Sequence, residues 1–165
     1  MLDYAATRQG FDGRIQWQQA DALGLPFEDA LFDVVCCQFG AMFFADRAAG
    51  YAEARRVLRL GGRFVFSVWN RIEENAFADA VTNAVIAGVS PHDLPRFLAR
   101  TPHGYHDVAL IREELRRSRF FDIDIEARDA SLLQLVTDRA MQAITSRHGE
   151  GPVTGKIRAY TIAAA

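Results

Sequence analysis

Residues 32–69 read FDVVCCQFGAMFFADRAAGYAEARRVLRLGGRFVFSVW, and this stretch determines the fold class. It begins with a continuous apolar run, Phe32–Phe39, which is typical of a strand buried on both faces of a parallel sheet. It ends with a second run, Arg63–Trp69, in which large apolar residues alternate as they do in a strand. A helix is predicted between the two runs. Strand, helix and strand in this order form the crossover unit of an α/β protein.

The helix of this unit is predicted from its ends and its buried face. Asp46 is of a residue type that caps helix N-termini, because its carboxylate accepts a hydrogen bond from a free backbone N–H. Tyr51, Ala54 and Leu58 recur at helical spacing and are expected to be buried. The glycine pair Gly61–Gly62 is expected to end the helix, since glycine adopts the left-handed conformation of a C-cap without strain.

Further elements are predicted on both sides of the crossover. Upstream, Ile15–Gln19 alternates weakly and predicts one more strand. Downstream, helices are predicted over Asn75–Ala87, Asp107–Ser118 and Ser131–His148, and strands over Phe120–Ala127 and Ile157–Ile162. Three prolines interrupt the region after the first of these helices. Residues 73–106 are therefore interpreted as a helical excursion from the sheet, acting as a lid or substrate-facing segment.

Composition narrows the classes of function. The chain has 165 residues, of which 50% are apolar and 24% charged, so a single domain with a real core is expected. The net charge of −2 argues against nucleic acid or an anionic membrane surface as the main partner. No apolar run is long enough to span a bilayer, and no secretory signal opens the sequence.

Two adjacent cysteines, Cys36 and Cys37, lie inside the first apolar run. Adjacent cysteines rarely form a disulfide, so they are interpreted as reduced core residues of a cytoplasmic protein. A reactive thiol at Cys37 is the alternative.

Three blocks of sequence together carry a family resemblance. The first is Asp21-Ala22 followed by LPFEDALFDVV, the second is CQFGAMFF, and the third is RVLRLGGRFVFSVW. In this combination the chain resembles class I S-adenosylmethionine-dependent methyltransferases, in particular the ubiquinone/menaquinone-biosynthesis type. The resemblance covers about two-thirds of the chain. One departure is Leu60, where the family usually has proline before the glycine pair.

The resemblance implies a fold and an activity. The family orders its strands 3-2-1-4-5-7-6 in a Rossmann-like sheet, and this chain matches strands 3 to 7 with their flanking helices. The implied reaction is transfer of a methyl group from S-adenosylmethionine to a small molecule. The aromatic and aliphatic content of residues 73–105 points to an apolar acceptor, although no residue there identifies the nucleophilic atom.

The resemblance also assigns cofactor residues. In the family, the aspartate that matches Asp21 accepts a hydrogen bond from the adenine amino group. The backbone at the position of Ala22 contacts the neighbouring ring nitrogen. Residues matching Gln38 and Phe39 line the methionine end of the cofactor, at the carboxyl end of a parallel strand, where α/β sheets bind ligands. Plainer roles compete with these: Asp21 as a solvated turn acid, Gln38 as a partner of strand-end backbone, and Phe39 as core.

The acceptor side is assigned more weakly. Phe43, Trp69 and His103 are candidate substrate contacts, although aromatic residues at such positions often serve packing alone. The spacing His103-x-x-His106 would allow a metal site on a helix, but Gly104 lies between them and no further ligand is near, so no metal is predicted. Either histidine could instead serve as a general base for the acceptor.

Two family features are missing from the sequence, namely the glycine-rich loop after the first strand and the acid that binds the ribose hydroxyls. The alignment starts inside the helix after the second strand, so residues 1–165 are interpreted as one N-terminally incomplete domain. The backbone of Val34–Gln38 would then be an unpaired edge, which proteins avoid. The chain could be a fragment, Ile15–Gln19 could pair beside this strand, or a homodimer could form through Phe32–Phe39.

The resemblance therefore favours a small-molecule methyltransferase. A non-catalytic remnant or partner subunit, unable to bind cofactor alone, is the alternative. A nicotinamide-dependent oxidoreductase is disfavoured, because the sequence lacks G-x-G-x-x-G.

Overall fold

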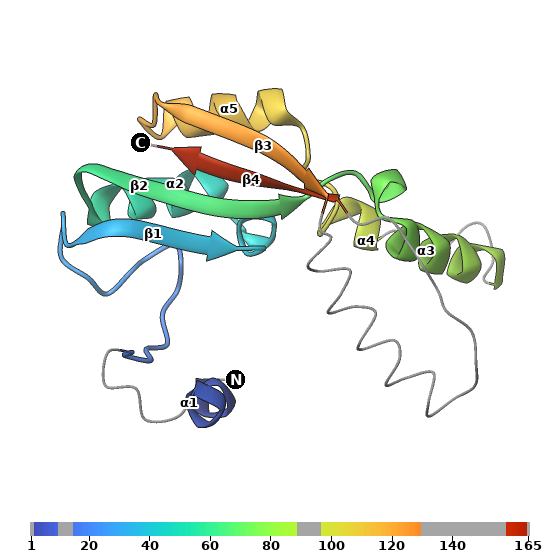
Figure 1. The fold of residues 1–165 in the computed structure, drawn as a ribbon, viewed down its shortest axis with the longest axis horizontal. Coiled ribbons are helices and arrows are strands. Elements are labelled where there is room, and N and C mark those ends of the chain that lie inside the picture. Colours follow the sequence, from blue (N-terminus) through green and yellow to red (C-terminus); the bar gives the residue numbers. More distant parts are fainter. Residues whose placement is uncertain (1, 10–14, 89–96, 130–157, 165) are drawn as a thin grey trace.

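The computed structural model describes residues 2–9, 15–88, 97–129 and 158–164 (Figure 1). Its elements are α1 (Leu2–Gln9), β1 (Phe32–Gln38), the 3₁₀ helix η1 (Ala41–Phe43), α2 (Arg47–Val57), β2 (Leu58–Trp69), the 3₁₀ helix η2 (Ile72–Glu74), α3 (Ala76–Gly88), α4 (Phe97–Arg100), α5 (Val108–Arg117), β3 (Ile123–Asp129) and β4 (Arg158–Ala164).

The described strands form one mixed sheet in the order β1-β2-β4-β3. β1 and β2 are parallel and joined by α2, so the predicted crossover is confirmed. β4 enters between β2 and β3 and is antiparallel to both. This order matches the last four strands, 4-5-7-6, of the sheet implied by the resemblance. The α/β class is therefore confirmed.

The core lies on the face of the sheet that α2 and α5 cover (Figure 1). Tyr51 of α2 contacts the rings of Phe64 and Phe66 on β2, with ring centroids 5.7 and 5.5 Å away. Phe120, at the end of α5, lies 5.7 Å from Phe64. All four side chains are at most 1% exposed. The predicted buried face of α2 is confirmed, because Ala54 and Leu58 are also buried.

The expectation that β1 is buried on both faces is wrong. Val34 is 56% exposed and Cys36 is exposed, whereas Val35 and Cys37 pack against the core. In the described sheet β1 is an edge strand, with β2 as its single neighbour. The apolar run gave the strand correctly, but its composition could not show that only one of its faces meets the described core.

The strand expected over Ile15–Gln19 is also absent. These residues have no regular structure and are exposed, and the first pairing along this segment is an isolated bridge between Asp21 and Gly24. Because β1 makes no ladder with them, the explanation in which this segment docks beside Val34–Gln38 is excluded. Weak alternation over five residues does not make a strand unless a neighbouring strand pairs with it.

The glycine pair does not end the helix. α2 stops at Val57, and β2 begins at Leu58 and runs through both glycines. The register between the strands jumps from Phe32↔Leu58 to Val34↔Arg63, and Gly61 has φ of +78° within this irregular stretch. The glycines therefore permit a bulge in β2. Sequence alone could not separate these roles, because a C-cap and a bulge can both place a glycine in left-handed backbone.

The remaining predicted elements agree with the structure where it describes them. α3 and α5 match their predicted helices, and the Asp107 carboxylate caps α5 by accepting from two backbone N–H groups. β3 begins three residues later than expected, because Phe120 still bonds back to Leu115 at the end of α5. β4 covers most of the last predicted strand. The helix predicted over Ser131–His148 lies outside the described residues.

The packing of Phe44 and Leu23 against α2 can be tested at Gly50. A Cβ at this position would lie 2.5 Å from the Phe44 ring and 3.3 Å from Leu23, so Gly50→Ala should lower the free energy of unfolding by about 1–3 kcal/mol. Gly24→Ala is the control, because a Cβ there meets nothing within 4 Å. Urea denaturation measures both variants. Equal stability of the two would contradict the packing of Phe44 and Leu23 against α2.

Candidate cofactor and acceptor site

The carboxyl ends of the parallel strands β1 and β2 form one side of the site. The ladder continues one residue beyond β1, because the Phe39 N–H donates to the Ser67 carbonyl over 3.1 Å. The Phe39 ring then stacks on the Trp69 indole, with centroids 4.1 Å apart and an interplanar angle of 18°. Two predicted site residues are thus in direct contact at the edge where α/β sheets bind ligands.

Phe39 has an unusual backbone conformation, with φ of +52°. A bulky side chain rarely adopts the left-handed region, and holding it there costs about 1–3 kcal/mol. The ladder bond to Ser67 and the stacked Trp69 ring oppose this strain. The conformation reverses the chain directly after β1 and leads into η1. Strained backbone of this kind is concentrated at functional sites.

A small pocket lies next to this aromatic pair. It has a volume of about 140 Å³ and is lined by Trp69, Asn75, Phe77, Ala78 and His103. The His103 ring centroid is 6.0 Å from that of Trp69. His103 is 5% exposed, and its Nδ1 lies 2.8 Å from the Asn70 carbonyl oxygen. The pocket therefore combines aromatic walls with two polar side chains, the Asn75 amide and the His103 imidazole.

A buried polar network fixes the segment that carries His103. The Tyr105 hydroxyl donates to the Glu114 carboxylate over 2.6 Å and lies 2.9 Å from the Tyr51 hydroxyl. Arg47 donates to both oxygens of Glu114, each over 2.9 Å, and its guanidinium lies 4.2 Å from the centre of the Tyr105 ring. The network joins α2 to α5 through Tyr105, two residues after His103.

The network also determines protonation states. Burial raises the pKa of the Tyr51 and Tyr105 hydroxyls, so both stay neutral. Burial also favours the neutral form of Glu114, but the hydrogen bonds from Arg47 and Tyr105 outweigh it and hold its pKa below the usual value. Glu114 is therefore an acceptor, which leaves Tyr51 as the donor to Tyr105.

Asp21 lies on the loop before β1, in a tight turn. Its Oδ1 accepts the Leu23 N–H over 2.9 Å, and its carbonyl accepts the Gly24 N–H over 3.1 Å. The residue is exposed and, with Gln19 to Ala22, lines an open hollow. Oδ2 has no hydrogen-bond partner among the described residues. Asp21 is thus a turn acid that still offers one free carboxylate oxygen.

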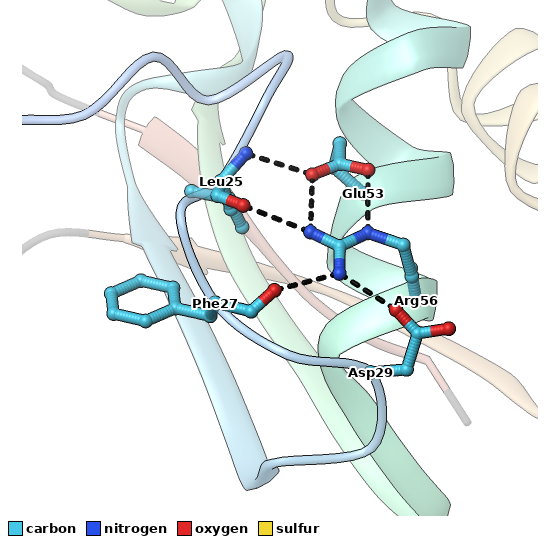
Figure 2. A network of polar contacts seen from close by, with 5 residues as sticks. All are labelled: Leu25, Phe27, Asp29, Glu53 and Arg56. Carbon is cyan, nitrogen blue, oxygen red and sulfur yellow. Dashed lines mark hydrogen bonds and ion pairs between the residues drawn. The ribbon is translucent and has the colours of Figure 1, made fainter.

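Arg56 of α2 anchors the following part of this loop (Figure 2). Its guanidinium donates to the carbonyls of Leu25 and Phe27 over 2.9 and 2.7 Å and to Asp29 over 2.8 Å. The same guanidinium binds both oxygens of Glu53, each over 2.8 Å, and Glu53 accepts the Leu25 N–H over 2.7 Å. The guanidinium of Arg56 therefore fixes the path of the loop between the turn at Asp21 and β1.

The two cysteines show different environments. Both are free thiols, Cys36 exposed and Cys37 half-buried. Burial raises the pKa of the Cys37 thiol and outweighs the hydrogen bonds from the Gly40 and Ala41 backbone. A raised pKa disfavours the thiolate, so this environment opposes the reactive-thiol alternative.

The structure groups some of the sequence-predicted site residues and separates others. Phe39, Trp69 and His103 form one continuous cluster. Gln38 ends β1 beside Ser67 and is exposed. Phe43, in η1, is 55% exposed and makes no ring contact with another described residue. Asp21 and Ala22 lie on the preceding loop, without a polar contact to this cluster among the described residues.

Sequence reasoning missed several residues of the site. Phe77 and Asn75 line the pocket, Asn70 holds His103, and Arg56 anchors the loop. Arg56 was visible as the first residue of the RVLRLGG block, but its partners on the loop lie 27 to 31 residues away in sequence. The Asn70 contact is made by a backbone carbonyl and had no signal in the side chains.

Neither a metal centre nor a membrane-spanning helix is found among the described residues. They contain no group of three histidine, cysteine or acidic side chains placed to hold a metal ion. His103 and His106 do not converge, because His106 Nδ1 lies 2.7 Å from the His103 carbonyl. No helix in the described part of the chain is long and apolar enough to cross a membrane.

Known proteins share sequence with this chain. Residues 1–66 match a family model described as a methyltransferase domain. Demethylmenaquinone methyltransferase of Deinococcus radiodurans is 41% identical over 97 residues, which cover 58% of this chain and 38% of that protein. The chloroplastic 2-phytyl-1,4-beta-naphthoquinone methyltransferase of Arabidopsis thaliana is 31% identical over 116 residues, which cover 63% of this chain and 44% of that protein.

A solved structure shares the fold. Phosphoethanolamine N-methyltransferase 2 of Haemonchus contortus, in complex with phosphomonomethylethanolamine and S-adenosylhomocysteine, matches with a TM-score of 0.56 at 14% identity, over 88% of this chain and 36% of that chain. The chain spans 38% and 44% of the length of the two curated relatives named above. The resemblance to class I methyltransferases of the ubiquinone/menaquinone type is confirmed.

The ion pair between Arg56 and Glu53, which holds the loop before β1, predicts that stability depends on pH. The hydrogen bonds from Arg56 and from the Leu25 N–H lower the pKa of Glu53 to about 2 from its usual value of 4.5. Because this pKa is lower in the folded state, its contribution to stability is complete above pH 4.5 and is lost as the pH falls towards 2. The chemical shift of the Leu25 amide should titrate with a midpoint near pH 2.

Arg56→Gln removes the charged partner and should move that midpoint upwards, towards 4.5. Arg59→Gln is the matched control on the neighbouring strand, because Arg59 pairs with Asp33 instead. A midpoint that is unchanged in Arg56→Gln would contradict the role of Arg56.

Proposed function

We propose that this chain, as part of a class I S-adenosylmethionine-dependent methyltransferase of the ubiquinone/menaquinone type, takes part in methyl transfer to a small, apolar molecule. One observation carries the proposal: the aromatic pair Phe39–Trp69 lies at the carboxyl ends of two parallel strands, beside a pocket with an imidazole. The sequence similarity over residues 1–66 includes β1 and most of β2.

The cofactor would be held at two places. Asp21 Oδ2, free and exposed on its turn, suits the amino group of adenine, and the Ala22 backbone suits the neighbouring ring nitrogen. Gln38 and Phe39, at the end of β1, suit the methionine end. The left-handed backbone at Phe39 fits a site where the chain must turn aside directly after the strand.

The bound cofactor supplies a methyl group on a positively charged sulfur. The residues of this chain position the reactants and keep water away, because the displacement requires a collinear arrangement. Trp69 and Phe77 provide apolar walls on the acceptor side, and His103 provides a polar group. Phe43 is proposed as a further acceptor contact, since η1 follows the strand end. Residues 73–106 carry the acceptor side of the pocket and are proposed as its lid.

The names of the relatives suggest the acceptor. Two relatives are named as methyltransferases of a demethylmenaquinone and of a naphthoquinone. A flat, apolar ring of this kind fits aromatic walls such as Trp69 and Phe77. We place the protein in the cytoplasm, because its cysteines Cys36 and Cys37 are free thiols.

Titration calorimetry with S-adenosylhomocysteine tests the cofactor site. Asp21→Asn keeps an acceptor for the Leu23 N–H but removes the second carboxylate oxygen, so affinity should fall about tenfold or more. Asp21→Ala should have at least the same effect. Glu28→Ala, an exposed acid on the same loop, is the control and should bind like the parent. Absence of binding at millimolar concentration would favour the non-catalytic remnant, and an unchanged affinity in Asp21→Asn would refute the site.

The exposed edge of β1 is proposed as a homodimer contact. β1 has one neighbour in the described sheet, and Val34 and Cys36 are exposed along it. An unpaired strand edge of this kind readily pairs with another strand. A second copy of this chain, meeting the first along Phe32–Phe39, would satisfy the free backbone groups.

Sedimentation equilibrium tests the dimer. The parent chain should associate reversibly in the micromolar range, and Val34→Lys should shift the equilibrium towards monomer, because lysine on an edge strand opposes pairing. Val81→Lys is the control, since Val81 is 55% exposed, close to the 56% of Val34, but lies in α3. A parent chain that remains monomeric at high concentration would refute the contact.

A further inference from the structure

The turn that presents Asp21 is supported from its downstream side. Residues 15–20, which lead into it, are exposed and have no regular structure. Within the turn, Asp21 accepts the N–H groups of Leu23 and Gly24, and these bonds fix its internal shape. Where the turn lies relative to the sheet therefore depends on what holds the chain around and after it.

Three residues on one face of α2 provide this support. Gly50, Glu53 and Arg56 follow one another at intervals of three residues, so they lie along one side of the helix. Leu23 packs at the first of them, because a Cβ on Gly50 would lie 3.3 Å from its side chain. Glu53 accepts the Leu25 N–H over 2.7 Å, and Arg56 donates to the Leu25 carbonyl over 2.9 Å. The helix thus contacts the chain inside the turn and directly after it.

Arg56 also holds the rest of the loop (Figure 2). Its guanidinium donates to the Phe27 carbonyl over 2.7 Å and to the Asp29 carboxylate over 2.8 Å. Its backbone carbonyl accepts the Ala30 N–H over 2.9 Å. The loop is therefore bonded to the last turn of α2 from Leu25 to Ala30.

The Arg56–Glu53 pair suits this task because of its geometry. The guanidinium is planar and always charged, and its N–H groups point in several directions, so one side chain serves two carbonyls and two carboxylates. Both side chains are partly shielded, with 30% of Arg56 and 19% of Glu53 exposed. A carboxylate and a guanidinium in this arrangement form charge-assisted bonds, which are stronger than those between neutral groups.

We propose that Arg56 and Glu53 are positioning residues for the cofactor, which hold the Asp21 turn in the place where adenine binds. They act through Asp21 and Ala22, the residues that the proposed function assigns to adenine. Without the pair the turn adopts several arrangements, and affinity falls in proportion to the fraction that can bind. This inference rests on the proposed function and deepens it by naming residues that determine cofactor affinity from outside the site.

Titration calorimetry with S-adenosylhomocysteine tests the role of Arg56. Arg56→Gln should bind about tenfold more weakly, as expected if about one-tenth of the molecules keep the competent turn. Arg56→Lys should lie between this variant and the parent, because lysine keeps the charge but not the planar group of donors. Arg55→Gln is the matched control, since Arg55 lies in the same helical turn and has no polar contact with the loop among the described residues. It should bind like the parent.

A double-mutant cycle tests whether Arg56 acts through the Asp21 turn. Asp21→Asn and Arg56→Gln should each weaken binding about tenfold, and independent effects would multiply to about a hundredfold. The combined variant should instead lose about tenfold to thirtyfold, because a turn that is already displaced gains little from the Asp21 carboxylate. A loss equal to the product would overturn the inference.

Amide hydrogen exchange separates a local effect from a loss of overall stability. The N–H groups of Leu23 and Leu25 bond Asp21 and Glu53, so both should exchange about tenfold faster in Arg56→Gln. The Phe66 N–H, on a strand paired on both sides, should keep its rate. An unchanged rate at Leu23, or an equal acceleration at Phe66, would overturn the inference.

The inference and the proposed function fail in different ways. If S-adenosylhomocysteine binds the parent chain and Arg56→Gln with equal affinity, the cofactor site stands and the inference alone fails. If the parent chain does not bind it at millimolar concentration, the cofactor site fails and the inference fails with it.

Discussion

The parallel pairing of β1 with β2 is the constraint on which the rest of the structure depends. The helix between them crosses over the sheet so that both strands run in the same direction, and their carboxyl ends meet at one edge. This edge is where Phe39 stacks on Trp69 and where His103 is held through Asn70. α2 supports both sides of this edge: Arg56 bonds the loop before β1, Tyr51 bonds Tyr105 in the segment after α4, and Arg47 pairs with Glu114 of α5.

The helix α2 therefore links the two halves of the site. Its last turn holds the loop that follows Asp21, and Tyr51 in its second turn bonds Tyr105 in the segment that carries His103. Both links use arginine forks on carboxylates, Arg56 on Glu53 and Arg47 on Glu114. A planar fork gives directional bonds that a lysine cannot replace. The proposed adenine and acceptor sites thus share one support, even though they touch no common side chain.

Local sequence patterns predicted most helices and strands, whereas they did not predict the exposure of β1 or the bulge in β2. The crossover, α5 and the Asp46 cap follow from periodicity and capping chemistry, which act within a few residues. The exposure of β1 and the bulge at Gly61 depend on which strand lies beside β1, and no local pattern records a neighbour. For the same reason the sequence identified Trp69 and His103 as candidates but did not show their contact with Phe39 and Asn70.

The pocket proposed for the acceptor has few polar groups in its lining, and this limits which molecules it can bind. Its walls are mostly carbon, and a polar substrate would leave hydrogen-bonding groups unsatisfied there, at a cost of about 1–3 kcal/mol for each group. Asn75 and His103 are the polar side chains among the residues that line it. The apolar ring proposed as acceptor would leave fewer groups unsatisfied in this pocket than a sugar or an amino acid, which would bring several donors and acceptors. The scarcity of polar groups in the lining thus supports the proposal of an apolar acceptor.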